Sequence, residues 1–220
     1  MLPYRLRENK MNSDKSEALV YLVDDEFSVR DSLALMIEST GHKVKSFASA
    51  EDFLECYDPT QPGCLLLDVR MPAMSGLELQ EELVTRAISI PIIFISGHAR
   101  IPDSAKAFRA GAVDFLEKPF DNEVLLERIS EAIKKDIAGR KQVAAQLKIQ
   151  NRMDYLTVRE QEVLSLMLKG HANKDMAKML DISNRTIEAH RARIMEKMQA
   201  ESLADLMLMS THYDLNEALN

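Results

Sequence analysis

Four short apolar runs alternate with amphipathic segments in the first part of the chain, and this alternation limits the fold more than any other feature. The runs cover residues 19–23, 64–67, 92–95 and 113–116. A regular exchange of buried strands and amphipathic helices specifies a parallel α/β sheet. In such sheets ligands gather at the carboxyl edges of the strands. The sequence therefore predicts an α/β domain with a site at one sheet edge.

Polar side chains follow the ends of these runs. Asp24 and Asp25 follow the first run, Asp68 the second, Ser96 the third, and Lys118 stands just past the fourth. An acidic pair after one apolar run is by itself more often a helix-capping turn. Three carboxylates, a hydroxyl and an amine at successive strand ends should instead converge on one crevice. We expect that crevice to hold a divalent cation and a phosphoryl group.

The motifs at these positions resemble those of a known family. They are VDDE at 23–26, LDVRMP at 67–72, ISGH at 95–98 and DFLEKPF at 114–120. Together and in this order they resemble the receiver domain of two-component response regulators, over residues 19–137. The resemblance implies a flavodoxin-like (βα)5 fold with strand order 2-1-3-4-5. Its second strand should cover about residues 43–47.

Asp68 is the carboxylate at the end of the central strand, which makes it the expected nucleophile and phosphoacceptor. Magnesium prefers oxygen ligands and retains several waters. We expect Mg²⁺ to be held by Asp25, Asp68 and the backbone carbonyl of Arg70, with Asp24 acting directly or through water. Lys118 should place an ammonium against the phosphoryl oxygens. Crowding of the carboxylates should raise the pKa of at least one of them.

The resemblance also implies a switch. Ser96 would donate its hydroxyl to the phosphoryl oxygens, and the aromatic ring of Phe115 would then move from solvent into the space that Ser96 leaves. This would change the face made by the fourth helix, fifth strand and fifth helix. Alternatively, Phe115 is a core residue of its strand. In family members the Lys118–Pro119 peptide is often cis.

Helix starts and faces in this domain follow simple spacing. Ser28 is a plausible N-cap for the first helix, and Ser75 with Gly76 opens another. The apolar faces comprise Val29, Leu33, Met36 and Ile37 in the first helix, Leu77 and Leu79 in the second, and Leu125, Ile129 and Ile133 in the last.

The chain has 220 residues, which exceeds one such domain by about 80. We assign 1–17 to a polar tail, 18–137 to the receiver, 138–153 to a helical linker and 154–220 to a second domain. The linker should continue the fifth helix, with a break near Gly139 left open. Its apolar stripe is either a dimer seam or a packing surface.

A helix-turn-helix is predicted in the second domain. Thr157 and Glu160 form a capping-box pattern before an apolar helix that Gly170 ends. A short helix at 174–180, a turn at 181–183 and a longer helix from 184 should follow. Such a second helix enters the DNA major groove. The stretch resembles the LuxR or NarL type of effector domain, and HRARIMEKM is closest to the FixJ branch.

Helical angles divide the recognition helix into two faces. The expected buried face comprises Ile187, His190, Ile194 and Met198. The expected DNA-contacting residues are Lys174, Arg185, Glu188, Ala189, Ala192 and Arg193. Arginines can serve phosphate or guanine, Glu188 can accept from a cytosine amino group, and the alanines can meet a thymine methyl. Many LuxR-type domains carry lysine at the position of Glu188.

The net charge of −7 does not exclude DNA binding, because affinity depends on where charge faces. Residues 184–197 carry four basic and two acidic side chains. Because one recognition helix carries so little positive charge, we expect the protein to bind DNA as a dimer. The affinity for DNA should then depend moderately on salt concentration.

The combined prediction is a transcriptional regulator, not a metabolic enzyme, that is phosphorylated on Asp68. Its partners would be a sensor histidine kinase, double-stranded promoter DNA and RNA polymerase, with homodimerisation on phosphorylation. No apolar run is long enough for a membrane span, which favours a cytoplasmic protein. One alternative is a haloacid-dehalogenase-like phosphatase, which also forms an aspartyl phosphate. Such an enzyme requires a second aspartate two residues after the nucleophile, and Arg70 occupies that position here. A DNA-binding protein with a vestigial receiver is the other alternative.

Overall fold

The computed structural model describes residues 18–97 and 106–213. It divides the chain into two compact units, Met1–Arg140 and Lys141–Asn220, and each is described separately. The predicted tail at 1–17 and the end of the ISGH motif lie outside the described residues.

The first unit alternates strands and helices as predicted. Its elements are β1 (Leu19–Val23), α2 (Phe27–Ser39), β2 (Lys43–Phe47), α3 (Ala50–Cys56), β3 (Gly63–Asp68), α4 (Gly76–Thr85), β4 (Ile92–Ser96), β5 (Asp114–Glu117) and the first part of α6 (Asn122–Asp154). Residues 106–109 are also helical.

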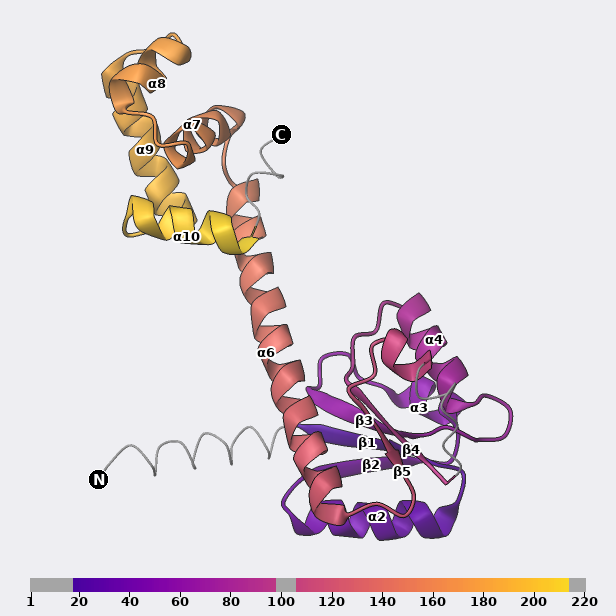
Figure 1. Ribbon diagram of the computed structural model, residues 1–220. Coiled ribbons are helices and arrows are strands. Elements are labelled where there is room, and N and C mark those ends of the chain that lie inside the picture. Colours follow the sequence, from indigo (N-terminus) through magenta and orange to yellow (C-terminus); the bar gives the residue numbers. More distant parts are fainter. Residues whose placement is uncertain (1–17, 98–105, 214–220) are drawn as a thin grey trace, which may run out of the picture. The chain divides into compact units, whose positions relative to one another are not determined.

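All five strands are parallel, and their order β2-β1-β3-β4-β5 confirms the predicted topology (Figure 1). Strands β3 and β4 extend beyond their apolar runs, because Asp68 pairs with Ile95 and Ser96 pairs with Glu117. Two of the predicted site residues are thus the last residues of central strands, which fixes their backbones. β5 begins one residue later than its apolar run.

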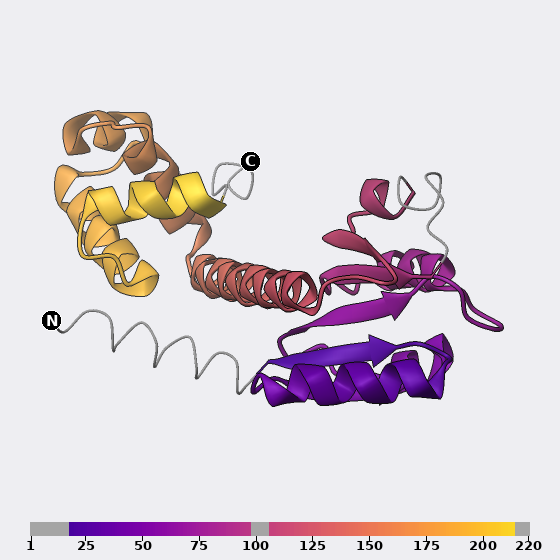
Figure 2. The same cartoon turned by 60° about the horizontal axis from the view of Figure 1, so that its bottom comes forward.

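Alternate residues of the central strands enter two separate cores. Leu65, Leu67 and Phe94 face α3 and α4, whereas Leu66 and Ile93 face α2 and α6. Figure 2 shows α2 lying along one side of the sheet. A sheet buried on both faces explains why its strands are continuously apolar rather than alternating.

Two predicted helix starts had different outcomes. α4 begins at Gly76 behind Ser75, whose hydroxyl accepts from the backbone N–H of Glu78 in a full capping box. The Ser28 prediction was wrong, since α2 begins at Phe27 and its N-cap is Glu26. Ser28 lies within the first turn and donates its hydroxyl to the Glu26 carboxylate. A serine one turn from an apolar face does not by itself fix a helix start.

The final helix of the unit, α6, continues through Gly139 without a break. Leu125, Ile129 and Ile133 are buried in the first unit, as their spacing predicted. Asp136 of α6 is 7% exposed. Its Oδ2 accepts from the backbone N–H of Gly63 at 2.9 Å and from Arg140 Nε at 2.6 Å. This carboxylate therefore attaches α6 to the start of β3.

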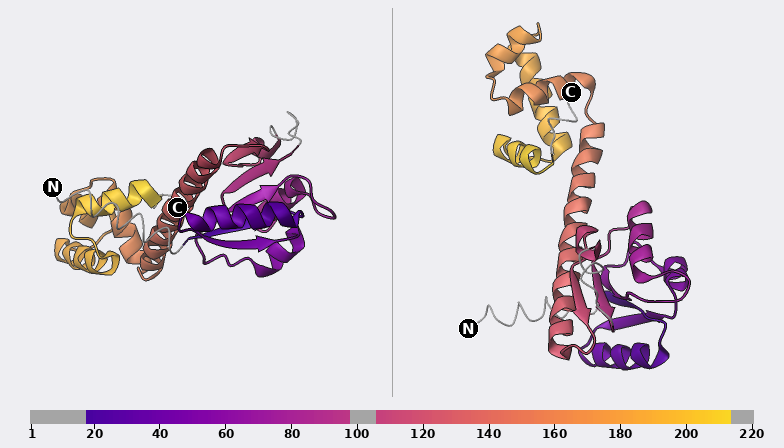
Figure 3. Two further views of the ribbon diagram at one scale, coloured as in Figure 1. Left: turned by 90° about the horizontal axis from the view of Figure 1, so that it is seen from below. Right: turned by 45° about the vertical axis from the view of Figure 1, so that its right-hand side comes forward.

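The second unit is helical. It contains the end of α6, α7 (Val158–Leu168), α8 (Asn173–Met179), α9 (Asn184–Met198) and α10 (Leu203–Tyr213). The helices α7–α10 are the orange to yellow elements of Figure 3. The core of the second unit, to which the end of α6 contributes, comprises Ile149, Met153, Leu156, Val163, Leu164, Met167, Met176, Ile187, Ile194, Met198, Ala200 and Leu206.

The helix-turn-helix boundaries agree closely with the sequence prediction. Thr157 caps α7 in a capping box with Glu160. Gly170 adopts a φ of 80° after that helix, and Asp181 adopts a φ of 52° in the turn between α8 and α9. Ser183 caps α9 by accepting from the backbone N–H of Thr186.

A membrane span would require a long and uniformly apolar helix. None of the helices within residues 18–97 and 106–213 meets that requirement.

Candidate functional sites

An ion-pair cluster lies at the carboxyl edge of the sheet. Lys118, which follows β5, places its Nζ 2.7 Å from Asp24 Oδ2 and 3.0 Å from Asp68 Oδ1. Asp24 is 1% exposed and Asp68 7% exposed. Residues that are 94 and 50 positions from Lys118 in the sequence are therefore joined by one ammonium.

Backbone N–H groups hold the other carboxylate oxygens. The N–H of Glu26 donates to Asp24 Oδ1 at 2.9 Å, and the N–H of Arg70 donates to Asp68 Oδ2 at 2.6 Å. Charge-assisted bonds of this kind fix the orientation of a carboxylate. Both side chains are thus held in place before any ligand arrives.

The titration behaviour of the cluster follows from burial and charge. Burial raises the pKa of Asp68, and this effect exceeds the opposing hydrogen bonds from Lys118 and Arg70. Burial lowers the pKa of Lys118, but its bonds to Asp24 and Asp68 raise that pKa by more. The sequence anticipated a raised carboxyl pKa from crowding. Burial is the larger cause, and the charge of Asp24 contributes less.

Asp25 is exposed, unlike the two carboxylates that Lys118 bridges. Among the residues that the structure describes, no three Asp, Glu, His or Cys side chains are gathered closely enough to hold a metal ion. The expected convergence of three carboxylates is therefore present for two of them. The donors at this edge are nonetheless oxygens, which is the ligand type that Mg²⁺ prefers.

Gly76 allows α4 to begin directly against the end of β3. A Cβ atom at Gly76 would lie 2.2 Å from the backbone oxygen of Asp68 and 3.0 Å from the Leu67 side chain. The N–H of Gly76 donates to the Val69 carbonyl at 3.1 Å. Only a glycine permits this approach, so it contributes to the position of the Asp68 backbone.

Ser96 is 1% exposed at the end of β4, and its carbonyl accepts from the N–H of Lys118 at 2.8 Å. Phe115 is partly buried, with its ring centroid 6.0 Å from that of Phe94. Its ring thus packs against the core rather than standing free in solvent. The Lys118–Pro119 peptide is cis.

Arg30 and the backbone of Glu26 were missed by sequence reasoning. Arg30 Nη1 donates to the Asp24 carbonyl at 2.7 Å and lies over the ring of Phe27. A basic residue one turn into the helix after an acidic pair was the available signal.

The six predicted DNA-contacting residues are all exposed. Five of them lie on α9, namely Arg185, Glu188, Ala189, Ala192 and Arg193, and Lys174 lies on α8. Of the expected buried face, Ile187, Ile194 and Met198 have no exposure. His190 is only partly buried, although its Nδ1 atom is covered.

Buried and partly buried charges hold the C-terminal end of α9. Lys197 Nζ donates to Glu160 Oε2 at 2.7 Å and to the Tyr155 carbonyl at 3.0 Å. Arg152 Nη1 donates to the Met198 carbonyl at 3.0 Å. A cation that satisfies the last carbonyls of a helix also complements its dipole. These contacts were not foreseen, since their partners are far apart in sequence.

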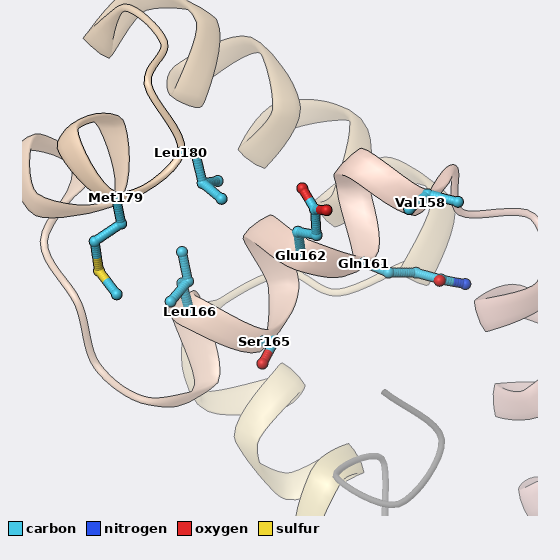
Figure 4. A pocket seen from close by; sticks show the side chains of 7 residues that line it. All are labelled: Val158, Gln161, Glu162, Ser165, Leu166, Met179 and Leu180. Atoms are coloured by element: carbon cyan, nitrogen blue, oxygen red, sulfur yellow. The ribbon is translucent and has the colours of Figure 1, made fainter. Parts of the chain in front are cut away.

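A pocket of about 430 Å³ lies between α7 and the end of α8 (Figure 4). Val158, Leu166 and Met179 give it apolar walls, and the Glu162 carboxylate lies at its side. No sequence motif had indicated this pocket.

An α/β unit with a lysine-bridged acidic edge, together with a helix-turn-helix unit, defines a signalling protein that binds DNA. Residues 20–130 match the response regulator receiver domain, and residues 154–210 match the LuxR family of bacterial regulatory proteins. The chain belongs to the response regulators that carry a LuxR-type DNA-binding domain. It is a transcriptional regulator of the two-component type and not a metabolic enzyme.

Similar proteins match most of the chain. The response regulator protein TmoT of Ectopseudomonas mendocina is 42% identical over 93% of this chain and 92% of its own length. The transcriptional regulatory protein FixJ of Rhizobium meliloti is 45% identical over 87% of this chain and 94% of its own. The structure of the response regulator StyR, which is 41% identical, covers 90% of this chain and 100% of its own with a TM-score of 0.83.

Proposed function

We propose that Asp68 accepts a phosphoryl group from a sensor histidine kinase and thereby controls promoter binding by α9. The observation that carries this proposal is the position of Asp68 at the end of β3, fixed by the Arg70 N–H and paired with Lys118. A receiver needs a kinase partner, and a LuxR-type domain needs DNA.

In the transfer step, a carboxylate oxygen of Asp68 attacks the phosphorus of a phosphohistidine. The O–P bond forms as the N–P bond breaks, and the imidazole leaves. Phosphoryl transfer mainly requires positioning and charge compensation. The Arg70 N–H orients the nucleophile, and Lys118 offers its ammonium to the transferred oxygens.

Mg²⁺ would be held by Asp24, Asp25, Asp68 and the backbone carbonyl of Arg70, where it supplies neutralising charge for the phosphoryl oxygens. The all-oxygen donor set fits this ion. The exposure of Asp25 leaves that carboxylate accessible to it. Lys118, which pairs with both buried carboxylates, can turn from Asp24 toward the incoming phosphoryl group.

Ser96 and Phe115 are proposed to report phosphorylation. The Ser96 hydroxyl would donate to the phosphoryl group, and the Phe115 ring would follow it inward. The backbone bond between Lys118 and Ser96 couples the two neighbouring strand ends and supports concerted movement.

Phosphorylation then favours a homodimer that places two α9 helices on one face of DNA. Half-site centres should lie about 10 base pairs apart, or a multiple of that. Arg185, Glu188, Ala189, Ala192 and Arg193 would enter the groove, and Lys174 would contact phosphate. A protein that binds promoter DNA is expected to act in the cytoplasm, with RNA polymerase as a further partner.

For the domain limits we propose 18–137 for the receiver, 138–153 for the linker and 154–220 for the DNA-binding domain, after a tail at 1–17.

The test is phosphorylation of the full-length chain by acetyl phosphate and by a sensor kinase, with Mg²⁺. The wild type should gain a hydroxylamine-sensitive phosphoryl label and become dimeric, while Asp68→Asn should do neither. Asp52→Asn removes an exposed aspartate on α3 and should behave as wild type. A wild type that takes no label, or an unlabelled Asp68→Asn that still dimerises on signal, would favour a vestigial receiver.

A further inference from the structure

Glu188 is an exposed acid on a helix that carries more basic than acidic side chains. Residues 184–197 carry Arg185, Arg191, Arg193 and Lys197 but only two acids, Glu188 and Glu196. Glu188 lies in the second turn after the N-cap, and the N-terminal part of a recognition helix contacts base edges. A carboxylate there is repelled by DNA phosphates. It therefore weakens binding unless a base supplies a hydrogen-bond donor.

A side chain of the same helix holds the Glu188 carboxylate in place. Asn184 Nδ2 donates to Glu188 Oε1 at 3.0 Å, four residues along α9. Such a pair restricts the rotamer of the glutamate. A carboxylate accepts at about four lone-pair sites. The bond from Asn184 thus orients the group and leaves capacity for a donor from outside the chain.

The neighbours on this face do not compete with Glu188 for an amino donor. Ala192 lies four residues after Glu188 and Ala189 lies beside it, and both are exposed. Their methyl groups offer no hydrogen bonds. Arg185, three residues before Glu188, is a cation that can serve phosphate or guanine, and as a donor it does not bind a cytosine amino group.

We propose that Glu188 reads a cytosine in each half-site by accepting from its N4 amino group, with Asn184 as the positioning residue. This rests on the proposed major-groove binding of α9. Guanine and thymine present acceptors in the groove, which a carboxylate repels. Adenine has an amino group, but its N7 acceptor stands beside it. Cytosine is the base that offers an amino donor without that neighbouring acceptor.

The experiment is selection of half-sites from randomised duplex DNA by the phosphorylated full-length chain. The wild type should select cytosine at one position, by about tenfold over other bases. Glu188→Ala should lose that preference, keep the others and bind unselected DNA more tightly. Asn184→Ala should weaken the same preference without altering any other. N4-methylcytosine at that position should weaken the wild type but not Glu188→Ala.

Glu196→Ala is the matched control, because Glu196 is an exposed acid on the same helix about 12 Å further along its axis. It should retain the cytosine preference. If Glu188→Ala selects the same site as the wild type, Glu188 belongs to a surface pair with Asn184 and the inference is wrong. If the wild type selects no site at all, the proposed function itself fails.

Discussion

Each unit of the chain contains a lysine paired with a buried carboxylate, but the two pairs are balanced differently. In the C-terminal unit, Glu160 Oε2 accepts from Lys197 and from both the N–H and the hydroxyl of Thr157. In the N-terminal unit, Lys118 must serve both Asp24 and Asp68. Within the described part of the chain, Glu160 thus accepts from an ammonium that no other carboxylate shares and from Thr157, whereas Asp24 and Asp68 share the ammonium of Lys118.

The pKa directions reflect this difference. Burial raises the pKa of Glu160, but the bonds from Lys197 and Thr157 lower it by more, so that it ends below its ordinary value. Burial raises the pKa of Asp68, and the shared ammonium does not offset it. A well-compensated buried acid is suited to holding a fold, whereas an incompletely compensated one remains available to a ligand.

The largest effect should come from Glu160→Ala. It would remove the capping-box carboxylate and leave Lys197 without its main partner. The loss should be about 3 kcal/mol, near the lower end for a broken buried pair, since the Lys197 side chain is 33% exposed. Hydrogen exchange of the α7 and α9 amides in the full-length chain measures it.

Glu162→Ala is the control for that prediction. Glu162 pairs with Arg159 on the surface, where the two side chains are 43% and 38% exposed. Its removal should cost less than about 1 kcal/mol. Equal losses of stability in Glu160→Ala and Glu162→Ala would show that the buried pair contributes no more stability than the surface pair.

Gly76→Ala should have the next largest effect, this time on the shared-ammonium site. The added methyl must displace the Asp68 backbone or α4, at a cost of about 2 kcal/mol. Phosphorylation of Asp68 should also slow. Gly139→Ala, where a Cβ meets nothing within 4 Å, should instead stabilise α6 by up to about 1 kcal/mol. Urea unfolding and the labelling rate test both, and a harmless Gly76→Ala would remove the steric argument.

The smallest and most diagnostic effect should come from Asp68→Asn, which ought to stabilise the first unit by about 1 kcal/mol at neutral pH. Because the pKa of Asp68 is raised in the folded state, the free energy of unfolding of the wild type falls as pH rises through that pKa and Asp68 ionises. The advantage of the variant should therefore disappear below the ordinary value of 3.8, where Asp68 is protonated in both states. Urea unfolding across acidic to neutral pH measures it. Destabilisation at pH 7 would mean that Lys118 compensates Asp68 fully.

The fold was predictable because strand positions and helix caps are local signals. The helix start at Ser75 and Gly76, the capping box at Thr157 and the start of α9 followed from the sequence, and the strand order was implied by the family resemblance. In the candidate site, the meeting of Asp24 and Asp68 was predictable, since parallel strands bring both residues to one edge.

The pairing within the site was not predictable from local signals. Which oxygen Lys118 contacts, and whether Asp25 joins it, depends on side-chain packing between residues far apart in sequence. For the same reason the sequence did not indicate that Lys197 reaches Glu160 or that Asp136 meets Gly63. Ser28 failed as a cap because any residue near a helix start can bond locally without defining it.

The contact between Asp136 and Gly63 has a consequence for how β3 responds to events at its far end. A buried carboxylate anchors the first residue of the strand, and a backbone N–H holds the carboxylate of its last residue. Hydrogen-bonded neighbours on both sides keep it from sliding out of register. A reaction at Asp68 should therefore leave the strand stationary and displace the surrounding loops.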